Sequence, residues 1–91
     1  MMKQKIVVKM ADIEGDIIRF KSYPVHFIAE QMGVKRYTAR ERSGLSQDGI
    51  TVTTLRSCKY IEIKNVETGK TFRRRIKTVL PVGTEHIVFS W

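Results

Sequence analysis

The sequence is short of the features that cross-link a chain or anchor it in a membrane. Its 91 residues include one cysteine, two prolines and no apolar run approaching the ~18 residues that span a bilayer. Because Cys58 has no partner for an internal disulfide, we expect a half-buried thiol in a reducing cytoplasm. The first residues, MMKQKIVVKM, lack the apolar core of a secretory signal, so neither export nor a membrane partner is predicted. The length suits one domain, residues 1–91.

Acidic residues are scarce in two stretches, and these stretches decide the charge of the chain. The net charge is +8, from 17 Lys and Arg and 9 Asp and Glu. Residues 35–45 hold four basic residues and one acidic residue, and residues 70–77 hold five basic residues and no acidic one. Such focused positive charge favours a polyanion, because neutralised phosphates release condensed counterions. We therefore expect contact with nucleic acid, and the alternative is a basic face that only keeps the chain in solution.

The residue spacings of metal and cofactor sites are also missing. The two histidines, His26 and His86, lie 60 positions apart, and no paired Cys or His spacing accompanies them. The sequence has no P-loop, no dinucleotide fingerprint and no nucleophile elbow. We expect no metal and no cofactor, and a non-catalytic protein in preference to an enzyme.

Apolar alternation predicts strands for most of the chain. In the N-terminal segment, a hairpin turning near Gly15 is favoured over a helix, and its alternation begins at Ile6, Val8 and Met10. A second strand pair flanks a turn at 66–68, with Gly69 at positive φ. Ile50, Val52 and Thr54 suggest a further strand, and a last strand has Ile87, Phe89 and Trp91 on its core face.

The register of the second hairpin follows from its side chains. Pairing Ile63 with Phe72 places Glu62 opposite Arg73 and Tyr60 opposite Arg75. In this register the inward positions of the second strand are Phe72, Ile76 and Leu80. Arg73, Arg75 and Lys77 then form a positive row outside, and Arg74 must lie at an edge or pair with an acid.

The clearest helix covers about 24–32, and the residues after it have two interpretations. Pro24 suits the first turn, Gly33 suits the cap, and an apolar stripe is formed by Val25, Ile28, Ala29 and Met32. If a second helix follows, residues 25–43 are a helix-turn-helix that reads duplex DNA. Ala39, Arg42 and Gly44 suit such a buried helix poorly, so we favour a basic strand over 34–42.

The stretch GVKRYTAR resembles the G-x-K-x-x-[ET]-x-R signature of ASCH domains, which belong to the PUA-like superfamily. The matching residues are Gly33, Lys35, Thr38 and Arg40, although Arg36 stands where a Thr is more usual. The C-terminal hairpin and final strand are also similar to small PUA-like proteins common in phage genomes. The resemblance implies a small β-barrel with a flanking helix and a cleft for RNA or a modified base. In members that are nucleoside amidohydrolases, it implies a catalytic Lys35 and Thr38 with a distant Glu, for which Glu62 and Glu67 are candidates.

These observations predict an α+β fold: a small PUA-like β-barrel or a strongly bent antiparallel sheet with one short helix. We expect the protein to bind RNA or single-stranded nucleic acid without catalysis. The predicted nucleic-acid-binding residues are Lys35, Arg36, Tyr37, Arg40, Arg42, Tyr60, Arg73, Arg75 and Lys77. The two tyrosines lie among basic residues, where each ring is expected either to stack an unpaired nucleobase or to pack on the side chain of an Arg. The alternatives are a helix-turn-helix DNA regulator, an ASCH-type nucleoside amidohydrolase, and a small inhibitor or adaptor that binds an acidic protein.

Overall fold

The computed structural model describes residues 11–47 and 49–91, except for the side chain of Val52. The expected alternation at Ile6, Val8 and Met10 therefore lies outside the described residues. Within the described ranges the chain is α+β, with seven strands in two sheets and three helices. None of these helices has the length and apolarity needed to cross a membrane.

Four strands form the first sheet, which we call sheet A. They are β1 (Ala11–Glu14), β2 (Ile17–Ser22), β4 (Tyr60–Asn65) and β5 (Thr71–Arg75), in the order β1-β2-β4-β5. The pairs β1–β2 and β4–β5 are antiparallel hairpins, whereas β2 and β4 run parallel. The β1–β2 turn has Gly15 at a φ of 62°, as expected for the predicted hairpin. The sheet is therefore mixed, which corrects the expectation of a purely antiparallel one.

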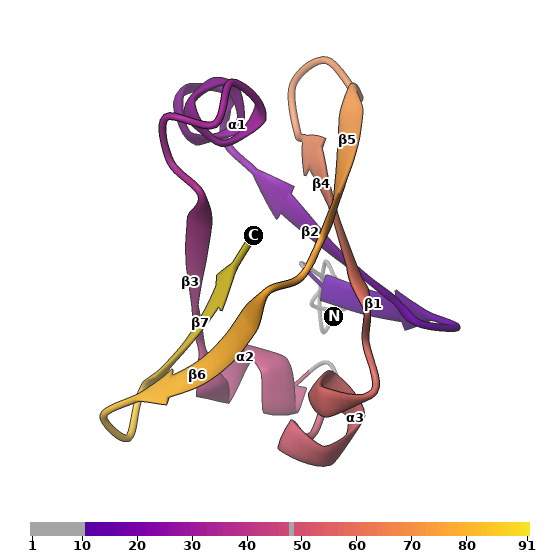
Figure 1. Ribbon diagram of the computed structural model, residues 1–91, viewed down its shortest axis with the longest axis vertical. Helices are drawn as coiled ribbons and strands as arrows, with labels where there is room; N and C mark the ends of the chain where they lie inside the picture. Colours follow the sequence, from indigo (N-terminus) through magenta and orange to yellow (C-terminus); the bar gives the residue numbers. More distant parts are fainter. Residues whose placement is uncertain (1–10, 48) are drawn as a thin grey trace, which may run out of the picture.

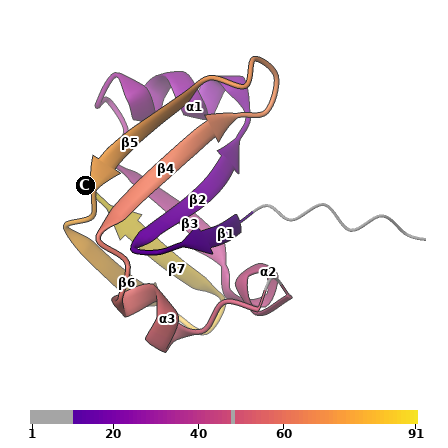
Figure 2. The same ribbon diagram turned by 90° about the vertical axis from the view of Figure 1, so that its right-hand side faces the viewer.

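The second sheet, sheet B, packs behind sheet A in Figure 2. It consists of β3 (Tyr37–Glu41), β7 (His86–Ser90) and β6 (Thr78–Val82), in the order β3-β7-β6 and antiparallel throughout. In Figure 1 the helix α1 (Pro24–Gln31) lies at one end of the two sheets, and α2 (Arg42–Gln47) and α3 (Val52–Arg56) lie at the other.

The strand β5 of sheet A runs into β6 of sheet B with no helix between them, and this junction joins the two sheets directly. The N–H of Ile76 donates to the carbonyl of Lys59 before β4, and the N–H of Lys77 donates to the carbonyl of Ser90 in β7. The chain therefore passes from one sheet to the other at these two residues. On the far side, β1 and β3 are the outer strands of their sheets, and the described strands form no closed barrel.

The predicted register of the β4–β5 hairpin is confirmed. Ile63 pairs with Phe72, Glu62 with Arg73 and Tyr60 with Arg75. The turn also matches, because Gly69 has a φ of 76° and the buried Asn65 side chain accepts hydrogen bonds from two turn N–H groups. Arg74 lies at the sheet edge, where its guanidinium donates to the carbonyl of Gln31.

The alternation of β5 does not continue into β6. Phe72 is buried and Ile76 packs on the core, but Val79 rather than Leu80 is the next residue that packs there. The crossing between sheets at Ile76 and Lys77 shifts the alternation by one residue, so that Leu80 faces outwards and is 56% exposed. The prediction that Leu80 faces the core is wrong for this reason.

The residues after α1 form a strand. The second helix that the helix-turn-helix interpretation requires is therefore not present there. Gly33 takes a φ of 77° after α1, and β3 begins at Tyr37 and pairs with β7. The helix itself is confirmed, with Pro24 in its first turn. However, the helix buries Phe27 and Glu30, and the predicted stripe points outwards, with Val25 73% and Met32 72% exposed. The Phe27 ring packs 5.3 Å from that of Phe72, which places the opposite side of the helix towards solvent.

The strand expected around Ile50 is also wrong. Helix α3 begins after Thr51, whose hydroxyl accepts a hydrogen bond from the N–H of Thr54. This cap converts an apparently alternating segment into a helical turn that buries Leu55. The structure thus has three helices where one was expected.

The core lies between the two sheets. Its aromatic side chains are Phe20, Phe27, Phe72, Phe89 and Trp91, with Ile and Leu residues from both sheets and the short helices. Ile87, Phe89 and Trp91 are buried on one face of the last strand, as predicted.

Candidate nucleic-acid interface

A pocket of about 380 Å³ opens between the end of β2 and the strand β3. Its walls contain basic and aromatic side chains, and no acidic residue is among them in the described chain. The residues that line it are Lys21, Ser22, Tyr23, His26, Lys35, Tyr37, Thr38, Ala39 and Arg40. Lys35, Thr38 and Arg40, the three side chains of the signature, therefore meet in one pocket, together with Tyr37.

A buried carboxylate lies beside this pocket. Glu30 on α1 is 0% exposed, and neither of its oxygens accepts a hydrogen bond from a described residue. Lys35 Nζ lies 3.6 Å from Glu30 Oε2. A buried charge without a close cation is costly, so this ion pair holds Lys35 at the pocket. Neither Glu62 nor Glu67, the acids considered from the sequence, lines the pocket.

Arg40 lines the pocket and bridges the two sheets. Its guanidinium donates to the Lys21 carbonyl at 3.0 Å, to Ser22 Oγ at 3.1 Å and to Thr38 Oγ1 at 3.1 Å. Its central carbon lies 4.5 Å from the centre of the Phe20 ring. Burial lowers the pKa of Arg40, and the nearby charge of Glu30 opposes that shift. Arg40 therefore mainly links β2 to β3 and so holds the two sheets together.

Two tyrosines stand at the rim. Tyr23 is 66% exposed and Tyr37 is 50% exposed, and both line the pocket. The ammonium of Lys35 lies 5.2 Å from the centre of the Tyr37 ring. An exposed ring with a cation beside it is an arrangement suited to stacking an unpaired base while its phosphate is held.

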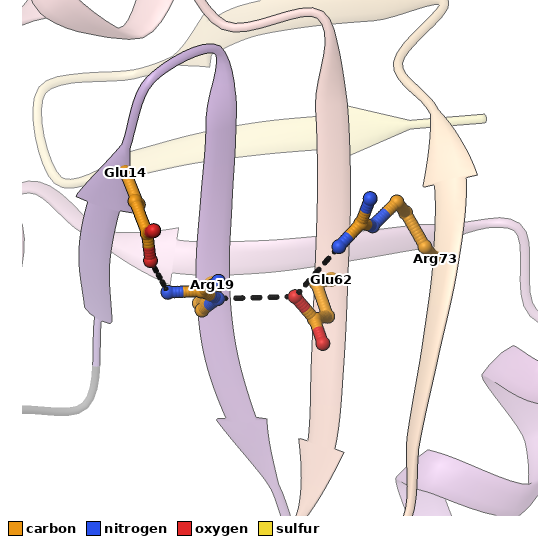
Figure 3. A network of polar contacts seen from close by, with 4 residues as sticks. All are labelled: Glu14, Arg19, Glu62 and Arg73. Carbon is orange, nitrogen blue, oxygen red and sulfur yellow. Dashed lines mark hydrogen bonds and ion pairs between the residues drawn. The ribbon is translucent and has the colours of Figure 1, made fainter.

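The outer face of sheet A carries a network of alternating charges, drawn in Figure 3. Arg19 is bonded to both Glu14 and Glu62, and Arg73 lies 3.5 Å from the same Glu62 carboxylate. The hydrogen bond from Arg19 is the main cause that lowers the pKa of Glu62. Because Arg73 is partly neutralised by Glu62, it is a weaker phosphate ligand than the sequence predicts.

The other two residues of the predicted positive row are not neutralised by an acidic side chain of the described residues. Arg75 and Lys77 are exposed, and neither has an ion pair with a described residue. Tyr60 lies on the same outer face, directly opposite Arg75. Tyr60 and Arg75 thus form a second basic and aromatic surface, separate from the residues that line the pocket, and Lys77 follows where the chain crosses to sheet B.

The remaining two predicted ligands lie apart from both surfaces. Arg36 is exposed beyond α1, where its Nε donates to the Gly33 carbonyl. Arg42 begins α2 at the opposite end of β3, where it lines a hollow that also contains Glu41 and Glu85. The acids beside Arg42 offset its positive charge.

Sequence reasoning missed Lys21, Tyr23, His26 and Glu30 at the pocket. A signal for Glu30 was present, because it is the only acid between 23 and 40, among several bases. No such signal marked Lys21, which reaches the site only because β2 lies beside it. No group of three or more metal-ligating side chains occurs among the described residues. Comparison with family models, curated proteins and solved structures finds no match to this chain.

Proposed function

We propose that the protein binds RNA or another single-stranded nucleic acid at the pocket between β2 and β3, without catalysis. The observation that carries this proposal is the pair of exposed tyrosines on a pocket whose charged lining residues are all basic. A volume of about 380 Å³ falls in the range of about 300–1,000 Å³ typical of small-ligand pockets. Bases within a duplex are stacked and paired, so a pocket of this kind favours an unpaired base.

The second surface, Tyr60 with Arg75, and the exposed Lys77 beyond it supply further phosphate contacts in this proposal. They add charge outside the pocket, which a strand longer than one nucleotide would require. Arg40 is assigned to the fold and not to phosphate, since three of its donors are used within the chain.

We also propose the PUA-like relationship on the basis of the arrangement around the signature. A short helix ends at Gly33, and the following residues bring Lys35, Thr38 and Arg40 to one pocket. Two sheets joined by β5–β6, with an open side between their outer strands, are compatible with an incompletely closed barrel. The resemblance supports a nucleic-acid function but does not supply its ligand.

The direct test is fluorescence anisotropy with a labelled 12-nucleotide RNA, the matching DNA strand and its duplex. We expect the single strands to bind more tightly than the duplex. Tyr37→Ala should weaken binding by about 5- to 150-fold, the equivalent of ~1–3 kcal/mol per stacked base. Tyr37→Phe is the matched control, because it keeps the ring and should bind nearly as the wild type does. Equal affinities of the Ala and Phe variants would contradict the stacking role.

The salt dependence tests the charged residues separately. Each phosphate contact with a single strand contributes about 0.7 to the slope of log K against log salt. Arg75→Ala and Lys77→Ala should each reduce the slope, whereas Arg73→Ala should reduce it less, because Glu62 already offsets its charge. Slopes that none of the three changes alters would remove this surface from the interface. No affinity for any nucleic acid at physiological salt would instead favour an inhibitor or adaptor of an acidic protein.

The buried Glu30 favours one second candidate, the nucleoside amidohydrolase. It supplies the acid beside Lys35 that could not be placed from the sequence. Binding ranks first because Thr38 is only 3% exposed and its hydroxyl already accepts a hydrogen bond from Arg40. Incubation with acylated cytidine tests this candidate. Hydrolysis that Glu30→Gln and Lys35→Ala both abolish would support it, and the absence of turnover by the wild type would reject it.

A further inference from the structure

The outward side chains of sheet A lie in three rows that cross β2, β4 and β5. The row at one end contains the second surface, and the middle row is the charge network of Figure 3. The third row consists of Lys21 on β2, Lys64 on β4 and Thr71 on β5, which are register partners. We call it the Lys21–Lys64 row. It lies at the end of β2 where the pocket opens.

This row holds two positive charges side by side. Lys21 and Lys64 face one another on neighbouring strands, whose backbones are about 4.8 Å apart. Like charges directly opposite one another destabilise a sheet. The acidic residues of β1 do not relieve this repulsion, because Asp12 and Glu14 lie beside the other two rows. Neither lysine has an ion pair with any residue that the structure describes.

The middle row of the same sheet is arranged in the opposite way. Arg19 and Arg73 both contact the carboxylate of Glu62, which lies between them (Figure 3). One row is therefore balanced within the chain, whereas its neighbour offers two ammonium groups and the exposed Thr71 hydroxyl without an acidic partner. Ammonium and hydroxyl groups are among the donors that proteins direct at phosphate oxygens. The chemistry of the Lys21–Lys64 row thus fits a phosphate.

A hollow of about 450 Å³ gives access to this row and connects it to the pocket. Lys21 lines both the hollow and the pocket between β2 and β3, whereas Lys64 and Thr71 line the hollow alone. The two acidic residues of the hollow, Asp12 and Glu62, are the register partners of Arg19. The positive charge without an acidic partner therefore lies on the side that shares Lys21 with the pocket.

We propose that Lys21, Lys64 and Thr71 form a phosphate subsite for the nucleotide next to the one held in the pocket. This inference rests on the proposed function and adds the direction in which the strand leaves the pocket, from β2 across β4 to β5. A strand whose base occupies the pocket brings its neighbouring phosphate to Lys21 at a high effective concentration. The phosphate relieves the repulsion between the two lysines, which the free protein has to bear.

The salt dependence of binding, measured by fluorescence anisotropy with the 12-nucleotide RNA, tests the subsite. Lys64→Gln is the decisive variant, because Lys64 lines the hollow but not the pocket. Loss of one phosphate contact should lower the slope of log K against log salt by about 0.7. The fall in affinity between about 50 and 200 mM salt should then be smaller by about 2.5-fold.

The stability of the same variant separates a binding role from a structural one. Lys64→Gln removes one of two facing like charges, so the free energy of unfolding in urea should stay the same or rise. A weaker affinity in a variant that is at least as stable as the wild type is a property of a ligand-binding residue. A loss of stability that accompanies the loss of affinity would overturn the subsite.

Arg56→Gln is the matched control, because it removes one exposed positive charge on α3, at the end of the sheets opposite α1 (Figure 1). It should leave the slope unchanged. If the wild type binds RNA and Tyr37→Ala weakens binding, but Lys64→Gln and Arg56→Gln have equal slopes, the subsite is overturned and the proposed function stands. If the wild type binds no single strand, the proposed function fails and the subsite fails with it.

Discussion

Arg40 gives the sharpest test of how the two sheets are held together. Its guanidinium bridges β2 and β3 with three hydrogen bonds and lies over the Phe20 ring. Arg40→Met leaves the buried Ser22 and Thr38 hydroxyls without their donor and removes a cation that stabilises Glu30. Removing one partner from a buried charged group costs about 3–5 kcal/mol. Since Arg40 is only partly buried, we expect a loss of about 3–4 kcal/mol in the free energy of unfolding.

Urea denaturation measures this loss directly. A domain of this size has about 5–15 kcal/mol of stability, so the change should be a large shift of the midpoint. Arg40→Lys keeps the charge but lacks the planar fork, and it should recover about half of the loss. Arg36→Met is the control, since Arg36 is exposed and makes one hydrogen bond, to Gly33 at 3.3 Å. It should change stability by no more than about 0.5 kcal/mol.

The opposite result would refute the reasoning. Suppose that the free energy of unfolding of Arg40→Met lies within about 1 kcal/mol of the wild-type value and that the variant loses nucleic-acid affinity instead. Arg40 would then be a nucleic-acid ligand and not a link between the sheets. The sheets would then be held together by the core alone, and the original assignment of Arg40 to phosphate would stand.

Three further changes test other parts of the structure. Phe27→Ala should lower the free energy of unfolding, measured by urea denaturation, by about 3–5 kcal/mol. Met32→Gln, on the exposed side of the same helix, should lower it by no more than about 0.5 kcal/mol. Equal losses would contradict the observed orientation of α1. Because the pKa of Glu62 is lowered in the folded state, its stabilisation is complete above the unfolded value of about 4.3 and disappears as the pH falls through the folded value. The stability difference between wild type and Glu62→Gln should therefore be largest near neutral pH and vanish in acid, and a difference independent of pH would be contrary to this. Burial raises the pKa of the Cys58 thiol. Iodoacetamide should therefore alkylate the native protein at pH 8 much more slowly than the urea-unfolded chain. Equal alkylation rates would show that the thiol is accessible in the native protein.

Local patterns were sufficient for the parts of the fold whose partners are close in sequence. The β4–β5 register follows from matching Ile63 with Phe72, because a shift of one residue would oppose Ile61 and Ile63 to arginines. Pro24 and Gly33 likewise mark the limits of α1 through their own backbone preferences. The signature residues Lys35, Thr38 and Arg40 also meet at a pocket, although the nucleic-acid role of that pocket remains a proposal.

Only the tertiary structure decided which face of each element meets the core. The apolar stripe of α1 points to solvent, because contact with Phe72 selects Phe27 over Val25 and Met32. The passage of β5–β6 between sheets shifts the alternation and exposes Leu80, which no local pattern records.

The sequence by itself determined the charge of this protein and the limits of its clearest helix and hairpin, and it favoured a strand after Gly33 over a second helix, because these depend on composition and on neighbouring residues. The tertiary structure decided that Glu30 is buried beside Lys35, that Arg40 points inwards, and that Leu80 lies on the outside of sheet B. Each of these depends on segments far apart in the chain, whose approach brings a partner for a buried charge or leaves an apolar side chain uncovered.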